Sequence, residues 1–160
     1  MSAHAEWVYP EECCGLMLGT ITSQDSGAQD SGAQDSGAHK YSTELVPLDN
    51  DWAPDVLPAD LAESVAVEHS QSKQRRYWIN PEDMLRVQKT ARDRGLVIVG
   101  IYHSHPDHVA EPSECDRVLA WPAYAYTIVS VRQGKAVDVQ NWTLDSDHQF
   151  RSEPIRVSPS

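Results

Sequence analysis

Residues 96–106 of the chain read Leu-Val-Ile-Val-Gly-Ile-Tyr-His-Ser-His-Pro. The run from Leu96 to Tyr102 is continuously apolar, which is typical of a strand that is buried on both faces of a sheet. We therefore predict a central strand over Leu96–Tyr102. The polar residues His103 and His105 follow directly after its predicted end.

A helix is predicted before this strand, and further strands are predicted on either side of it in the sequence. Asn80 followed by Pro81 is typical of a helix start, because asparagine caps a helix and proline fits its first turn. Gly95 ends the helical spacing of apolar residues. Three more strands are predicted over Leu16–Ile21, Ala125–Val131 and Ala136–Trp142. Helices interleaved with strands favour an α/β or α+β fold, with a mixed β-sheet flanked by helices.

The size of the chain limits the number of domains. It has 160 residues, of which 40% are hydrophobic, enough to bury one full core but hardly two. We therefore predict one domain over residues 1–160. Its 24 acidic and 13 basic residues give a net charge of -11, which would repel a phosphate backbone, so no nucleic-acid partner is expected.

The few cysteines and the N-terminus indicate the compartment. Two of the three cysteines are adjacent, at Cys13 and Cys14, which fits neither a disulfide framework nor a cysteine-based zinc module. The first residues lack the basic and apolar regions of a signal peptide, and no apolar run approaches the roughly 20 residues of a membrane span. The expectation is a soluble, cytoplasmic protein without a membrane partner.

Two polar stretches interrupt the predicted elements. Residues 24–38 are three copies of Gln-Asp-Ser-Gly-Ala, whose small and polar side chains bury too little apolar surface to order the chain. We predict that this repeat is a disordered loop. A second polar stretch, from about Asp49 to Arg76, contains a possible short helix over Ala59–His69. Both stretches are expected at the periphery.

The two histidines that follow the central strand are candidate metal ligands. Because side chains alternate along an extended backbone, His103 and His105 point the same way and can converge on one ion. Asp116, eleven residues after His105, is the preferred third ligand, with Cys115 and His108 as weaker competitors. Two histidines, one carboxylate and an open position are typical of a catalytic zinc site, where the ion lowers the pKa of a bound water to about 7.

Each of these residues also has a structural interpretation. A His-x-His motif by itself is more often part of a polar loop than a metal site. Ser113 and Asp116 can simply begin a helix that ends before Pro122, with Ser113 as its N-cap. A cap and a metal ligand are compatible roles. Glu12, next to Glu11, is by default a solvated surface acid.

The joint pattern of these residues resembles the JAMM (MPN-type) metalloprotease family. In that signature a glutamate is followed, far along the chain, by His-x-His, seven residues, serine, two residues and aspartate. The chain reproduces this spacing with His103, His105, Ser113 and Asp116. Residues 10–19, Pro-Glu-Glu-Cys-Cys-Gly-Leu-Met-Leu-Gly, resemble the family's junction between first helix and strand, which selects Glu12 as the catalytic glutamate. The similarity runs from about His4 to about Trp142 without the two polar stretches.

This resemblance implies a cytidine-deaminase-like sandwich that holds one zinc ion per chain. Glu12 would be the general base that takes a proton from the attacking water and later gives it to the leaving amine. Ser113 would hydrogen-bond the oxyanion of the tetrahedral intermediate. His103, His105 and Asp116 would hold the zinc.

The resemblance also implies a class of substrate. The compact glutamate motif is similar to the stand-alone prokaryotic branch, whose members process ubiquitin-like sulfur-carrier proteins and cut after a C-terminal Gly-Gly. Two alternatives stay open: a catalytically inert MPN-type interaction module, and a peptidase with another substrate such as a cell-wall peptide. A nucleoside deaminase is excluded because the chain lacks His-x-Glu paired with Pro-Cys-x-x-Cys.

Overall fold

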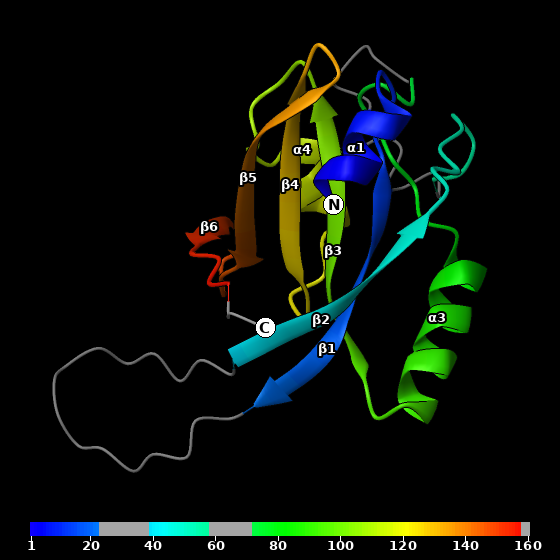
Figure 1. Cartoon of the computed structure of the whole chain (residues 1–160), viewed down its shortest axis with the longest axis vertical. Coiled ribbons are helices and arrows are strands. Elements are labelled where there is room, and N and C mark those ends of the chain that lie inside the picture. Colours follow the sequence, from blue (N-terminus) through cyan, green and yellow to red (C-terminus); the bar gives the residue numbers. More distant parts are fainter. Residues whose placement is uncertain (23–38, 58–71, 158–160) are drawn as a thin grey trace, which may run out of the picture.

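The computed structural model describes residues 1–22, 39–57 and 72–157 of the chain. The strands in these ranges form one sheet in the order β2-β1-β3-β4-β5-β6 (Figure 1). The elements are α1 Ser2–Val8, β1 Cys14–Thr22, β2 His39–Leu48, α3 Pro81–Asp93, β3 Val97–Pro106, α4 Glu114–Leu119, β4 Ala125–Arg132, β5 Lys135–Leu144 and β6 Phe150–Glu153. The predicted repeat loop at 24–38 and the predicted helix at 59–69 lie outside the described residues.

The sheet is mixed, as predicted. Strands β3 and β4 run parallel, and every other neighbouring pair is antiparallel. A parallel pair needs a crossover connection, and the segment that contains α4 provides it. The mixed sheet with helices confirms the predicted α+β class.

Helices cover both faces of the sheet, and each face has its own apolar cluster. On one face, α1 contributes Ala5 to a cluster with Met17 of β1 and Val129 of β4. On the other face, α3 packs Val87 and Ala91 against Leu16 of β1 and its neighbours. In Figure 1 α1 lies in front of the sheet and α4 behind it. Adjacent residues of β1 therefore serve opposite faces, as expected for an extended strand.

The helix start predicted at Asn80 is present in the structure. The Asn80 side chain accepts a hydrogen bond from the Glu82 backbone N–H at 2.9 Å, and Pro81 occupies the first turn. Gly95, just past the end of α3, has φ 72°, a left-handed conformation that glycine adopts without strain.

No helix in the described ranges is long and apolar enough to cross a membrane.

The structure corrects two expectations about the strands. The central strand does not end at Tyr102 but continues to Pro106, because its pairing with β4 continues to Pro106 opposite Val131. His103 and His105 therefore lie within β3. The edge strands β2 and β6 were not predicted. All of their residues are half-buried or exposed, so neither strand shows a clear apolar pattern.

Candidate active site

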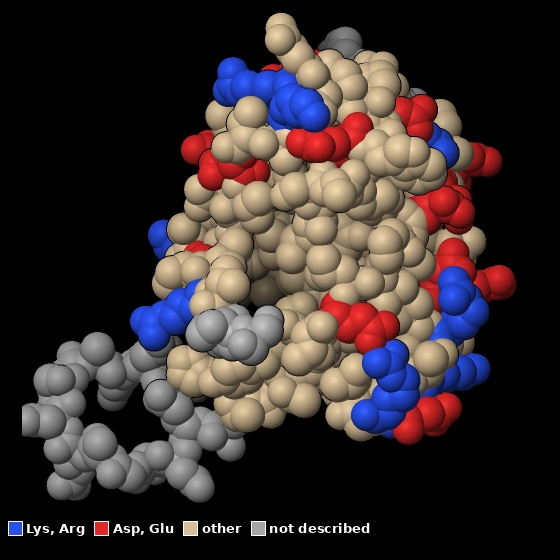
Figure 2. All heavy atoms as spheres, in the orientation of Figure 1, with Lys and Arg blue, Asp and Glu red and all other residues tan. Residues whose placement is uncertain are grey.

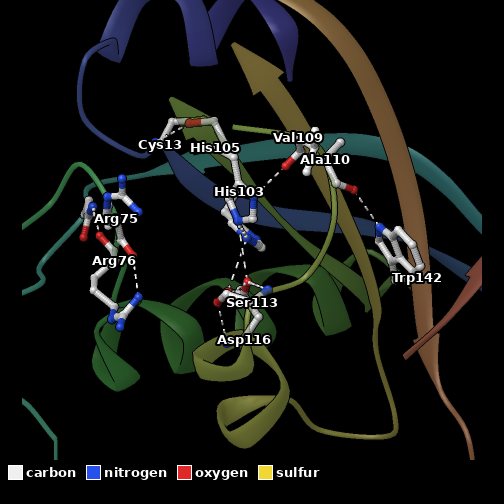
Figure 3. Close-up of polar contacts among 12 residues, drawn as sticks. Cys13, Arg75, Arg76, His103, His105, Val109, Ala110, Ser113, Asp116 and Trp142 are labelled. Carbon is white, nitrogen blue, oxygen red and sulfur yellow. Dashed lines mark hydrogen bonds and ion pairs between the residues drawn. The ribbon is translucent and has the colours of Figure 1, made fainter. Parts of the chain in front are cut away.

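The side chains of His103, His105 and Asp116 converge at the end of β3. The Nε2 atoms of His103 and His105 lie 3.0 Å apart. Asp116 of α4 places Oδ1 at 3.3 Å from His103 Nε2 and Oδ2 at 3.5 Å from His105 Nε2. All three residues are buried, and Figure 3 shows Asp116 reaching the histidines from α4.

These three side chains can hold a metal ion, and they fit zinc. A tetrahedral zinc ion with ligand atoms at 2.0–2.1 Å places any two of those atoms about 3.3–3.4 Å apart. The observed separations of 3.0, 3.3 and 3.5 Å are close to this value. Among the residues that the structure describes, the group of possible metal ligands consists of His103, His105 and Asp116 and does not include Cys115 or His108.

Contacts around the histidines orient them for this role. His105 Nδ1 lies 2.9 Å from the carbonyl oxygen of Val109. When Nδ1 carries the proton and donates it to this carbonyl, Nε2 keeps its lone pair for a metal. The ring of Tyr77 stacks on His103, with centroids 4.4 Å apart. Both imidazole rings are thus fixed by neighbours that are not themselves ligands.

The aspartate is fixed by the start of α4, as the helix-start interpretation predicted. The Ser113 side chain accepts a hydrogen bond from the Asp116 backbone N–H at 3.1 Å. The backbone N–H and the hydroxyl of Ser113 both donate to Asp116 Oδ2, each at 2.7 Å. Ser113 is therefore an N-cap in a capping box, and the same contacts aim the carboxylate at the histidines.

Charge and burial set the protonation of the three candidate ligands. Burial disfavours the Asp116 carboxylate, but His103 and His105 outweigh it and hold the pKa of Asp116 well below its usual value. Burial lowers the pKa of His103 and so favours the neutral ring that a metal requires. Burial also acts to lower the pKa of His105, but the hydrogen bond to Asp116 and the charges of Asp116 and Glu12 together outweigh it, so the pKa of this histidine is raised.

Glu12 lies beside this group, and Glu11 does not. Cys14 of β1 pairs with His103 of β3. This pairing brings Glu12, two positions before Cys14, close to the histidines. Glu12 is buried and lines a pocket of ≈ 180 Å³ together with His105 and Ser113, whereas Glu11 is exposed. Burial raises the pKa of Glu12 to about 8, and a cation bound nearby would lower it again.

Two buried polar residues that hold Glu12 in place were missed by the sequence analysis. Ser104 lies between the two histidines, and its hydroxyl accepts a hydrogen bond from the Cys13 backbone N–H at 2.8 Å. The Asn50 amide donates to the Glu12 carbonyl at 3.0 Å and to the Arg76 carbonyl at 2.9 Å. No local pattern indicated either residue, because the partners lie far away in the sequence.

The Asn50 side chain also accepts two hydrogen bonds, from the backbone N–H groups of Trp52 and Trp78, at 3.0 and 3.1 Å. We expect Asn50→Ala to lower the free energy of unfolding by about 2–4 kcal/mol, because it leaves several buried backbone groups without partners. Urea denaturation measures this loss. Asn80→Ala, which removes an exposed helix cap, should cost only about 1 kcal/mol. Equal losses of stability in the two variants would contradict the conclusion that the buried Asn50 side chain connects several backbone segments.

The fold and the site together define a class of α+β domain with a candidate metal centre at the end of its central strand. The chain belongs to the prokaryotic homologues of the JAB domain, whose family model matches residues 1–145. This match confirms the resemblance to the JAMM (MPN-type) family that the motif spacing indicated.

One curated relative and two solved structures are similar to the chain. A desampylase from Haloferax volcanii is 35% identical over 82 residues, which are 51% of this chain and 55% of the desampylase. The chain thus matches about half the length of this relative. The solution structure of a Salinibacter ruber protein has 32% identity and a TM-score of 0.59, and the match covers 95% of this chain and 81% of the other. A Desulfitobacterium hafniense protein, at 24% identity and a TM-score of 0.64 over 99% and 86% of the two chains, shares the fold.

Proposed function

We propose that the chain is a zinc-dependent metallo(iso)peptidase that hydrolyses a peptide or isopeptide bond, with the C-terminal Gly-Gly of a ubiquitin-like sulfur-carrier protein on the acyl side. The observation that carries this proposal is the pocket that the buried Glu12 lines together with His105, which belongs to the group of His103, His105 and Asp116. Membership of the JAB family and the similarity to a desampylase support it. We also propose that residues 1–160 form one domain and that it works in a reducing cytoplasm, which suits its buried free thiols.

In this proposal His103, His105 and Asp116 hold one zinc ion. When bound, the ion supplies Lewis-acid chemistry, polarising the scissile carbonyl and making water a nucleophile at neutral pH. Glu12 accepts the proton of the attacking water and gives it to the nitrogen of the leaving amine as the C–N bond breaks. The burial that raises the pKa of Glu12 suits a group that alternates between base and acid.

Ser113 has a less direct part than the resemblance implied. Its hydroxyl donates to Asp116 Oδ2 in the structure, so the proton is already engaged. To stabilise an oxyanion, the hydroxyl would have to turn from Asp116 toward the pocket that Ser113 also lines. We propose both roles for Ser113, a fixed one in orienting Asp116 and a transient one toward the oxyanion.

Hydrolysis of a defined substrate tests the proposal. We expect the protein to release the acceptor from a sulfur-carrier protein whose C-terminal Gly-Gly is joined to another amine, as followed by mass spectrometry. A chelator such as phenanthroline should stop the reaction, and added zinc should restore it. Tight zinc binding without turnover would instead indicate an interaction module, and turnover only on a cell-wall peptide would change the substrate class.

A further inference from the structure

Three consecutive backbone carbonyls in the loop after β3 each lie within hydrogen-bond distance of a side-chain donor. The pairs are the Ser130 hydroxyl with the His108 carbonyl at 2.5 Å, His105 Nδ1 with the Val109 carbonyl at 2.9 Å, and the Trp142 indole N–H with the Ala110 carbonyl at 3.0 Å. In Figure 3, His105 and Trp142 flank this short segment of the loop. The carbonyl beside His105 is therefore held between two further contacts.

The two outer donors come from strands of the same sheet. Ser130 of β4 is opposite His105 in the parallel pair of β3 and β4, and it is buried. Trp142 is a half-buried residue of β5, which pairs with β4 at Tyr126. Side chains on hydrogen-bonded strands have little freedom to move relative to one another. The sheet itself thus fixes the loop against β3.

The position of the Val109 carbonyl matters for His105. This carbonyl favours the ring form that carries its proton on Nδ1, and this form keeps the lone pair of Nε2 for a metal. The Val109 side chain is 52% exposed, so its own packing contributes little to fixing the backbone at this point. The neighbouring hydrogen bonds from Ser130 and Trp142 are left to do so.

We propose that Trp142 is a positioning residue of the candidate metal centre. Its indole N–H, together with the Ser130 hydroxyl, holds the loop so that the Val109 carbonyl keeps His105 Nε2 directed at the ion. Neither Trp142 nor Ser130 touches the reacting atoms, since both act through the backbone of the loop. This role rests on the zinc site of the proposed function.

The two donors are uncharged, which makes their effect separable from the field of the whole protein. On the molecular face shown in Figure 2, basic side chains are interspersed with acidic ones near the edges. The net charge of -11 attracts cations without specificity. Replacing an indole or a hydroxyl by another uncharged group leaves this attraction unchanged. A change in zinc affinity would therefore report on the site.

Trp142→Phe tests the role, because it keeps an aromatic ring and removes the N–H donor. We expect the zinc Kd to rise roughly 10-fold, the lower end of the range for residues that orient a metal ligand, since Trp142 acts through the loop. Competition with a chromophoric chelator measures this Kd. Ser130→Ala should change it in the same direction.

A second measurement uses the metal-free protein. Nitrogen-15 NMR of the imidazole rings at alkaline pH distinguishes the two neutral forms of His105, whose signals are assigned by their absence in His105→Ala. We expect one form, protonated on Nδ1, in the wild type and a mixture of both forms in Trp142→Phe. A merely structural role would lower the urea midpoint of Trp142→Phe without changing the ring form or the zinc Kd.

The matched control is Trp121→Phe, the same chemical change at another tryptophan. Trp121 is 64% exposed and stacks on Tyr124, a contact that phenylalanine can keep. This variant should have the zinc Kd and the His105 ring form of the wild type. Either value unchanged in folded Trp142→Phe would overturn the proposal, and so would an equal effect of Trp121→Phe. If circular dichroism shows that Trp142→Phe is unfolded, Ser130→Ala decides by the same two measurements.

The two measurements separate a failure of this role from a failure of the proposed function. If the wild-type protein binds no zinc, the metallopeptidase assignment fails, and the ring form of His105 in the metal-free variants alone decides whether Trp142 positions it. If the wild type binds zinc and cleaves its substrate while Trp142→Phe keeps the same Kd, only the positioning role is refuted.

Discussion

Glu12→Gln is expected to lower turnover by roughly 10²–10⁴-fold while zinc content and substrate affinity are kept, because the amide has the shape of the acid but cannot accept the proton. Glu12 is the residue to test as the general base, because its side chain is buried and lines the pocket together with His105. Steady-state kinetics on a carrier protein whose C-terminal Gly-Gly is joined to another amine gives turnover and affinity, and metal analysis of the same samples gives the zinc content.

The control for this experiment is the neighbouring residue. Glu11 is exposed and is not among the pocket-lining residues, so Glu11→Gln should keep nearly full activity. The two variants change net charge equally, and a general electrostatic effect would therefore appear in both. Similar losses in the two variants would show that the general base has been assigned to the wrong position, and an active Glu12→Gln protein would leave the site without a base.

Much of the fold could be predicted because its signals are local. The apolar run before His103 predicted the central strand, and Asn80 with Pro81 predicted the start of α3, since each depends on residues close in sequence. The helix start at Ser113 was predicted in the same way. The extent of β3 could not be, because its last residues are held extended by pairing with β4.

The surroundings of the candidate site were much less predictable than its possible ligands. Alternation along a strand indicated that the two histidines point the same way, and the spacing of the family signature supported Asp116 as the residue that joins them. Asn50 and Ser104 act through partners 38 and 91 positions away, and nothing in their local sequence indicates those contacts.

The wild-type protein is expected to bind about one zinc per chain, and the double variant His103→Ala/His105→Ala is expected to lose it. Each single variant should also lose most of its zinc on dialysis, because removing one of three protein ligands leaves too few to hold the ion. Elemental analysis of dialysed protein gives the stoichiometry, and circular dichroism checks that each variant is folded. Loss of activity should follow loss of zinc.

His108→Ala and Cys115→Ser are the matched controls, because both residues are sequence neighbours of the ligands and were alternatives to Asp116. The ligand group formed by the described residues does not include either of them, so both variants should keep a full equivalent of zinc. If His108→Ala lost as much zinc as His105→Ala, the third ligand would be His108 and not Asp116. Full occupancy in the double histidine variant would refute the metal centre, because Asp116 would then be its only remaining predicted ligand, and a single carboxylate does not hold zinc through dialysis.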